Sequence, residues 1–397
     1  MIKNRHIHIL QWLLCSMLTV LLSACSSGDA AEETKEATHQ QPQLAIYVYA
    51  PEQAAAKRNA APTRADVGQV DPINNTTNEG LIKSLQIWVY ESETGNYNYV
   101  GYFSPEDMAA LNSGQGTTYQ IPVSDDFASN KPAVNVYVMA NVTSANCGIG
   151  ELNKETTRDA LLKGAKITTG HFGLGTLVKS VPEDGLPFAG YLTAQPVVGD
   201  APALRVGSAT EVSTVQLTRA VSKLRFVFSK TTGEPKVNIT SIKINEGMIP
   251  NEEYLFKTPD SKTYNTEAKE LLSPAISDIA ETDDPTKFIY TDQEAQEYEN
   301  LINTAANKKD PEKPEVTVYG PIYLRESDKQ LEGTITYTIG GGAPQTANFA
   351  MQQTGDFSRN HTWIVYAYYA GAGNLQVQSL YVKDWSTKEL NHQVYNW

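Results

Sequence analysis

The chain has 397 residues, and its 32 basic and 45 acidic residues give a net charge of −13. This length fits two domains of ordinary size, and the acidic balance argues against nucleic acid and anionic membrane surfaces as partners. Two of the three cysteines, Cys15 and Cys25, belong to the amino-terminal leader region, so Cys147 stands alone in the rest of the chain. Neither a disulfide nor a cysteine-based metal site is expected there, and Cys147 is predicted to be a small buried residue.

The amino terminus has the pattern of an export signal. A positively charged start precedes an apolar run over residues 9–22, and the small residues Ser23 and Ala24 come directly before Cys25. The run is too short for a membrane-spanning helix, which needs about 20 apolar residues. Small residues followed by cysteine are typical of a bacterial lipoprotein, in which Cys25 becomes the acylated first residue of the mature chain. An ordinary cleaved signal with an incidental cysteine is the alternative.

A single strand follows the leader and is separated from the remaining strands by a long polar stretch. Its apolar residues alternate, which places them on one face: Leu44, Ile46, Val48 and Ala50. Residues 52–78 are rich in Ala, Asn, Thr and Pro and show no periodicity. This stretch contains Arg58 and Arg64, and polar segments of this kind are where proteases cut.

Beyond residue 80 the sequence predicts mainly strands with few helices. Alternation of apolar and polar residues, with β-branched and aromatic enrichment, predicts strands over residues 81–90, 97–103, 119–123, 133–141, 186–192, 203–206 and 212–217. Short helices are expected over residues 104–111 and 156–163. In the first of these strands we expect Leu85, Ile87 and Val89 to face inward and Trp88 and Tyr90 to lie opposite.

The strand pattern restarts near residue 218. Strands are predicted over residues 223–228, 237–244, 316–324, 331–339, 345–351, 362–369, 375–385 and 392–397. Between them, residues 258–310 are polar and partly helical, with apolar residues at helical spacing from Tyr298 to Ala305. The fold class is therefore all-β, in two domains that meet near Thr218.

No constellation of residues for catalysis or metal binding is evident. The histidines beyond the leader are far apart, and the pairs Asp125–Asp126 and Asp283–Asp284 are predicted to lie in solvated loops without a calcium-loop pattern. Phosphate-loop, dinucleotide and nucleophile-elbow motifs are absent from the sequence. We expect no enzyme activity, no cofactor and no metal.

At this point the sequence resembles the FimA-type major fimbrial subunits of Bacteroidales, the type V pilins. The resemblance runs along the chain in order, although residues 258–310 do not align with it. It rests on the motif ending at Cys25 and on the segments Thr63-Arg64-Ala65, Ile87-Trp88-Val89-Tyr90, Val136-Tyr137-Val138-Met139-Ala140-Asn141, Thr218-Arg219-Ala220-Val221-Ser222-Lys223-Leu224, Arg359-Asn360-His361 and Val382-Lys383-Asp384-Trp385.

The resemblance implies two transthyretin-like β-sandwich domains with short helical insertions. It also implies a lipoprotein precursor in the outer membrane, an Arg-specific protease and polymerisation with other fimbrial subunits, both copies of this chain and accessory pilins. Cleavage would fall between Arg64 and Ala65, with Arg58 as the alternative. The expected parts are residues 1–24 (signal), 25–64 (lipidated propeptide), 65–217 and 218–397 (the two domains). The donated strand would come from the carboxy terminus and use Leu375, Val377, Tyr381, Trp385, Val394 and Trp397.

Two other interpretations stay open at this stage. The chain could be an anchored lipoprotein adhesin that is never cut and binds glycans through strand aromatics such as Trp363, Tyr366 and Tyr368. It could also be a tip or accessory subunit of a fimbria. The presence of carboxy-terminal strand sequence favours a shaft subunit, because a tip subunit need not donate a strand.

Overall fold

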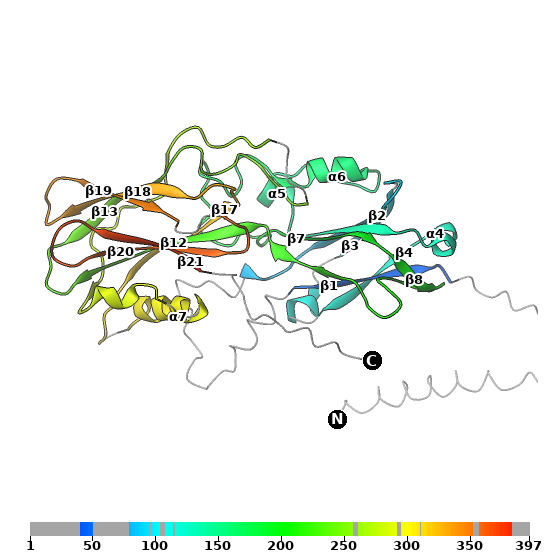
Figure 1. The fold of residues 1–397 in the computed structure, drawn as a ribbon, viewed down its shortest axis with the longest axis horizontal. Helices are drawn as coiled ribbons and strands as arrows, with labels where there is room; N and C mark the ends of the chain where they lie inside the picture. The colour runs from blue at the N-terminus through cyan, green and yellow to red at the C-terminus, as the bar shows by residue number, and fades with distance from the viewer. Residues whose placement is uncertain are drawn as a thin grey trace, which may run out of the picture. The chain divides into compact units, whose positions relative to one another are not determined.

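The computed structural model describes residues 40–50, 79–95, 97–103, 108–113, 116–256, 261–291, 295–309, 311–351 and 357–382. The expected all-β class is confirmed, since strands predominate and the helices are short. Four larger sheets pair into two sandwiches that follow each other along the chain (Figure 1). Both sandwiches lie in one compact unit that begins at Gln41.

The first sandwich consists of two five-stranded sheets. One sheet has the order β10-β1-β9-β8, with β4 also paired to β1, and the other has the order β11-β7-β5-β2-β3. The bounds are β1 Gln43–Tyr49, β2 Leu85–Glu91, β3 Tyr97–Phe103, β4 Thr117–Pro122, β5 Val134–Ala140, β7 Phe188–Gln195, β8 Val197–Asp200, β9 Ala203–Val206, β10 Thr214–Gln216 and β11 Thr218–Arg219.

Strand β2 is buried on both faces. Leu85, Ile87 and Val89 face inward as expected, but Trp88 and Tyr90 are also fully buried. The second face is covered by the segment that holds the short helices α5 (Ser144–Cys147) and α6 (Arg158–Gly164), and the Tyr90 hydroxyl donates to the Thr156 carbonyl at 2.9 Å. Cys147 lies in this layer and is fully buried, and burial raises the pKa of its thiol to about 12.

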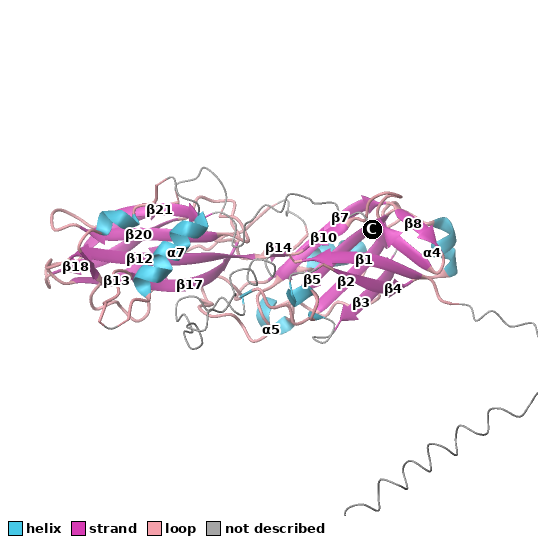
Figure 2. Ribbon diagram, turned by 90° about the horizontal axis from the view of Figure 1, so that it is seen from below, coloured by secondary structure: helices cyan, strands magenta, loops and turns pink. Residues whose placement is uncertain are grey.

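The second sandwich has a third layer on one side. Its sheets have the orders β16-β12-β20-β21, with β17 also paired to β12, and β15-β13-β18-β19. Helix α7 (Ala295–Ala306) covers the outer face of the first of these sheets, as Figures 1 and 2 show. The strands are β12 Val221–Thr231, β13 Val237–Ile244, β15 Lys269–Glu270, β16 Glu281–Thr282, β17 Thr317–Arg325, β18 Glu332–Ile339, β19 Gln345–Ala350, β20 Thr362–Tyr369 and β21 Gln376–Val382.

The insertion at 258–310 therefore has a structural role in the layer that α7 forms. Tyr298 and Ile302 are fully buried against Val227, Ile364 and Tyr366 of the sheet. The helical spacing that the sequence shows for these residues is confirmed, because one apolar stripe of α7 faces the strands.

The remaining elements are short. Strands β6 (Lys166–Ile167) and β14 (Glu253–Tyr254) form a two-stranded sheet between segments of the two halves of the chain. The other helices in the described residues are η2 Leu111–Ser113, α4 Asp125–Asn130 and η3 Pro285–Phe288. Asp125 and Asp126 open α4, whose N-cap is Ser124, so the prediction that this acidic pair lies in a loop was wrong. The Ser124 hydroxyl and two acids in the first turn are the favourable start of a helix.

Candidate functional site

Strand β1 occupies a central place in its sheet. On one side it pairs antiparallel with β4 over Gln43 to Val48. On the other side it pairs in parallel with two strands in succession, β9 along its first half and β10 along its second half. Because neighbouring strands lie about 4.8 Å apart, β1 fills a slot roughly 9–10 Å wide between these edges.

Backbone hydrogen bonds continue beyond both ends of this pairing. The Val123 amide donates to the Pro42 carbonyl at 2.9 Å, and the Gln43 amide donates to the Pro202 carbonyl at 2.7 Å. At the other end, the Leu217 amide donates to the Tyr49 carbonyl at 2.8 Å. The loss of β1 would therefore leave unpaired N–H and C=O groups along both edges of the slot, and such edges are templates for another strand.

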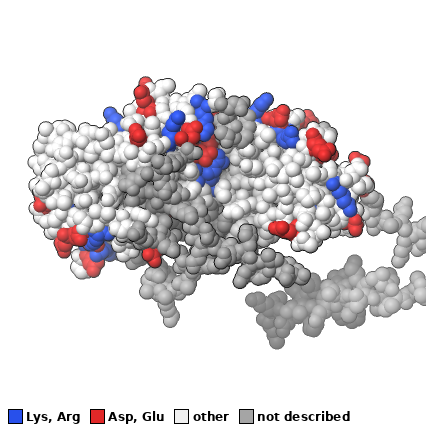
Figure 3. Space-filling model, viewed as in Figure 1, with Lys and Arg blue, Asp and Glu red and all other residues white. Residues whose placement is uncertain are grey.

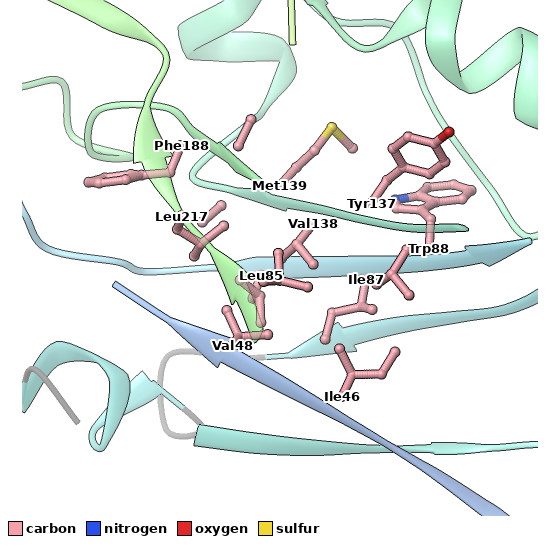
Figure 4. Close-up of a cluster of buried hydrophobic side chains, with 14 of the residues drawn as sticks. Ile46, Val48, Leu85, Ile87, Trp88, Tyr137, Val138, Met139, Phe188 and Leu217 are labelled. Carbon is pink, nitrogen blue, oxygen red and sulfur yellow. The ribbon is translucent and has the colours of Figure 1, made fainter. Parts of the chain in front are cut away.

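The inward face of β1 forms part of the core of the first sandwich. Leu44, Ile46 and Val48 are completely buried, and Ala50 is 1% exposed. Figure 4 shows Ile46 and Val48 lying against Leu85 and Ile87 of β2 in the opposite sheet. Burial of a large aliphatic side chain contributes about 1.5–3 kcal/mol, so these three side chains together contribute roughly 4–9 kcal/mol.

The outward face of β1 also fits its neighbours closely. Tyr47 and Tyr49 are half-buried there, as the alternation predicts. A Cβ atom on Gly116 would lie 1.8 Å from the Tyr47 hydroxyl oxygen, so only glycine allows this approach. Both faces of the slot are thus shaped for an extended segment with alternating side chains.

The carboxy-terminal candidates lie in or beyond the second sandwich. Strand β21 is antiparallel to β20 and forms the edge of the described sheet. Leu375, just before β21, is 4% exposed, and Val377 packs against the core of the same sandwich. Tyr381 belongs to β21. The other predicted residues of this region, Trp385, Val394 and Trp397, lie outside the described residues, as do Cys25, Arg58, Arg64 and Ala65.

Just beyond the long stretch that contains Arg64, the chain is held by a buried ionic network. The Glu79 carboxylate is 3% exposed, accepts a hydrogen bond from the Tyr323 hydroxyl at 2.5 Å and pairs with the Lys223 ammonium at 3.2 Å. The Arg219 guanidinium donates to the Glu79 backbone carbonyl at 3.1 Å. The network joins the start of the first sandwich to strands β11, β12 and β17.

The network extends to helix α7. Glu299 pairs with Arg225 at 3.0 Å and lies 3.7 Å from Lys223, and both cations are buried. Arg219 and Lys223 belong to the Thr218–Leu224 motif that the sequence singled out. The sequence offered no sign of their partner, because Glu79 is 144 residues away from Lys223.

We expect the substitution Glu79→Gln to lower the free energy of unfolding by about 3 kcal/mol at neutral pH. Breaking a buried ion pair costs about 3–5 kcal/mol, and Glu299 still offers Lys223 a counter-charge, which favours the lower end. Urea unfolding measures the difference. Glu93→Gln, a substitution at an exposed glutamate, is the control and should change little. Equal stabilities for Glu79→Gln and the unchanged chain would contradict this account.

The same network should make the free energy of unfolding depend on pH. Burial raises the pKa of the Glu79 carboxyl, but Lys223, Arg219 and the Tyr323 hydroxyl more than offset it, so the pKa lies below its usual value. A carboxyl with a lowered pKa stabilises the fold above its unfolded-state value, and this contribution is lost as the pH falls through the folded-state pKa. The stability gap between the unchanged chain and Glu79→Gln should therefore narrow in acid.

Two of the three strand aromatics considered for glycan binding are buried. Trp363 is 2% exposed and Tyr366 is fully buried, where its hydroxyl donates to the Pro285 carbonyl at 2.6 Å. Tyr368 is half-buried and stacks on Tyr366. The interpretation that strand aromatics stack on sugars was wrong for Trp363 and Tyr366, because Trp363 fills the core and Tyr366 fills the interface below α7.

We also searched the described residues for metal sites, membrane-spanning helices and charged patches. Among them, no three His, Cys, Asp or Glu side chains gather as metal ligands do. No helix in the same part of the chain is long and apolar enough to cross a membrane. On the face drawn in Figure 3, acidic and basic side chains are interspersed, and the described atoms form no extended patch of one sign.

Comparison with known proteins finds one family model that matches part of the chain. Residues 62–219 match the family model described as major fimbrial subunit protein (FimA). No curated protein matches the sequence. Among solved structures, the tip fimbrial protein Mfa3 from Porphyromonas gingivalis, with a C-terminal truncation, is 11% identical with a TM-score of 0.45, over 87% of this chain and 100% of that one. A fimbrial assembly protein from Parabacteroides distasonis is 12% identical with a TM-score of 0.43, over 86% and 96%.

Proposed function

We propose that this chain, which belongs through residues 62–219 to the FimA family of major fimbrial subunits, polymerises by replacing β1 with a strand from another subunit. The family implies a place in a cell-surface fimbria and association with other fimbrial subunits. The proposal adds the way in which those subunits join and a role in adhesion as a structural component without enzyme activity.

The single observation that carries the proposal is the position of β1. The strand is buried in the middle of a sheet, yet it belongs to the segment that precedes Arg58 and Arg64. A cut after Arg64 would separate β1 covalently from the rest of the sandwich. An extended segment from a partner could then satisfy both edges of the slot and fill its side-chain positions, which is the strand-addition mode of binding.

In this proposal the precursor is first anchored in the membrane and is then cut by a protease. Cys25 is acylated after removal of residues 1–24, and the acyl chains hold the precursor at the outer membrane. An Arg-specific protease cuts between Arg64 and Ala65 and releases residues 25–64 together with β1. The two sandwiches, residues 65–217 and 218–397, form the mature subunit.

The donor is assigned to the carboxy-terminal residues beyond β21. Strand β21 already completes its own sheet, and Leu375 is buried in its own core, so withdrawing β21 would expose β20. Residues 383–397 carry Trp385, Val394 and Trp397, which supply large apolar side chains for the slot. Head-to-tail donation of this kind is heterologous and produces open filaments.

A chain that ends at Val382 tests the donor assignment. We expect it to fold and to be cut, because the described sheets are complete without the later residues, but to form no fibres alone. Mixed with unchanged chain, it should accept a donor without offering one, and so shorten the fibres seen by negative-stain electron microscopy. Fibres of normal length from the shortened chain alone would overturn the assignment.

A further inference from the structure

A cavity of about 390 Å³ lies between the first half of β7 and the segment around β14, and Gln216 of β10 forms part of its wall. Its wall includes Tyr191 from β7, residues 252–256, and the side chains of Glu326 and Arg359. Ligand cavities commonly measure about 300–1,000 Å³ and often occur where two parts of a chain meet. The volume suits one sugar ring or a short oligosaccharide end.

An aromatic surface is held in place at the mouth of this cavity. Tyr191 is 52% exposed, the most exposed of the large hydrophobic side chains in the described residues. Its ring stacks on Tyr137, with centroids 6.2 Å apart, and meets Phe256 edge-on at 6.3 Å. Tyr137 and Phe256 are themselves almost buried. The Tyr191 ring is therefore oriented before any ligand arrives, with part of its surface open to solvent.

The charges around the cavity are already paired. Lys166 donates to both oxygens of Glu252 at 2.8 Å. Arg359 pairs with Glu326 and lies 3.2 Å from Oε1 of Glu253. A cationic ligand would have to displace these partners, and an anionic ligand would meet three carboxyl groups. The charge arrangement therefore favours an uncharged ligand.

One buried polar atom has unused capacity for hydrogen bonding. Glu253 is 4% exposed, and its Oε2 accepts the Glu326 amide at 2.7 Å. Its Oε1 accepts no hydrogen bond from the described residues, although it lies at the ion-pair distance from Arg359 given above. Burial raises the pKa of Glu253 to about 8, so a protonated carboxyl could also donate to a ligand. A buried polar atom without a hydrogen bond calls for an explanation, and a ligand that supplies the missing partner is one.

We propose that this cavity binds a neutral hexose, either free or at the end of a glycan, with the apolar face of the sugar on the Tyr191 ring and its hydroxyl groups directed to Glu253 and the neighbouring polar side chains. A sugar combines an apolar C–H face with a rim of hydroxyl groups, which matches an oriented aromatic ring beside paired carboxyl and guanidinium groups. This binding would give the subunit an adhesive function of its own. It does not depend on strand exchange, because Tyr191, Glu253, Glu326 and Arg359, which the proposal uses, belong neither to β1 nor to the strands that pair with it.

Saturation-transfer NMR on the purified full-length chain tests the proposal with three neutral probes: methyl α-mannoside, methyl β-galactoside and methyl β-glucoside. We expect at least one of them to bind. Tyr191→Ala should weaken that binding at least about tenfold, whereas Tyr191→Phe, which keeps the ring, should stay within about twofold. Because Tyr191 is largely exposed, both variants should remain folded, and circular dichroism checks this.

Val212→Ala is the matched control. Val212 is the other exposed large hydrophobic residue, at 43%, and it does not line the cavity. Its substitution should leave sugar binding unchanged. The proposal fails if none of the three neutral glycosides binds, or if binding persists unchanged in Tyr191→Ala. It also fails if glucosamine binds and the neutral sugars do not, since that result would identify a site for cations.

Discussion

The substitution Arg64→Ala is expected to abolish fibres and to leave an uncut, lipidated monomer at the outer membrane. An Arg-specific protease requires the guanidinium group at the cleavage position, and without a cut β1 remains tethered to its own slot. The roughly 4–9 kcal/mol of burial that Leu44, Ile46 and Val48 contribute would hold the open slot to a fraction on the order of 10⁻³ to 10⁻⁶. Exchange with another subunit would then be rare. Electron microscopy of sheared surface material and an immunoblot of membrane fractions measure the outcome.

The matched control for this experiment is Arg58→Ala, which removes the other arginine of the same polar stretch. We expect normal fibres from it. Fibres of normal length from Arg64→Ala would contradict processing at Arg64. If Arg58→Ala alone stopped fibre formation, the cleavage position would move to Arg58, and the strand-exchange mechanism would stand with a shorter propeptide.

The substitution Ile46→Ala should destabilise the uncut chain and leave finished fibres unaffected. Ile46 is completely buried, and truncation of a buried isoleucine to alanine costs about 2–5 kcal/mol through lost burial and the cavity left behind. In the fibre that we propose, however, β1 has been removed, so the substituted residue would no longer be present. Urea unfolding of the precursor and thermal dissociation of the fibre measure the two states.

Ala45→Ser is the control, because Ala45 lies on the half-buried outer face of the same strand and keeps the same backbone pairing. It should change neither measurement appreciably. A fibre that loses stability in step with the Ile46→Ala precursor would show that β1 remains in the mature subunit. That single result would favour an anchored chain over a strand-exchanging one.

Much of the fold could be predicted because strand alternation is a local signal. The predicted bounds of β3, β9, β13 and β20 agree with the structure residue for residue. The alternation of Leu44, Ile46 and Val48 correctly indicated which face of β1 is buried. These predictions needed only the two-residue period of a strand with one buried face.

Short strands and long-range contacts could not be predicted from this local period. Strand β8 has the sequence Val197-Val198-Gly199-Asp200, which is too short to show a period. The parallel pairing of β1 with β9 and β10 brings together residues about 160 positions apart, and nothing in their local sequences specifies it. Glu79 stands alone in a polar segment, and its role follows only from the distant Lys223 and Tyr323.

A few predictions failed where a local pattern had more than one structural meaning. Alternating aromatic residues on β20 could signal an exposed binding surface or a strand covered on both sides. The second meaning holds, because α7 covers the outer face above Tyr366. The acidic pair Asp125–Asp126 could have been recognised as a helix start, since Ser124 precedes it as a favourable N-cap.

The amino-terminal sequence of the protein sheared from the cell surface shows whether β1 leaves the chain before fibres form. We expect a sequence that begins at Ala65, because strand exchange requires the lipidated segment and β1 to leave before the slot accepts a partner strand. A mature chain that begins at a blocked, acylated Cys25 would mean that β1 stays in its sheet, and it would contradict assembly by strand exchange.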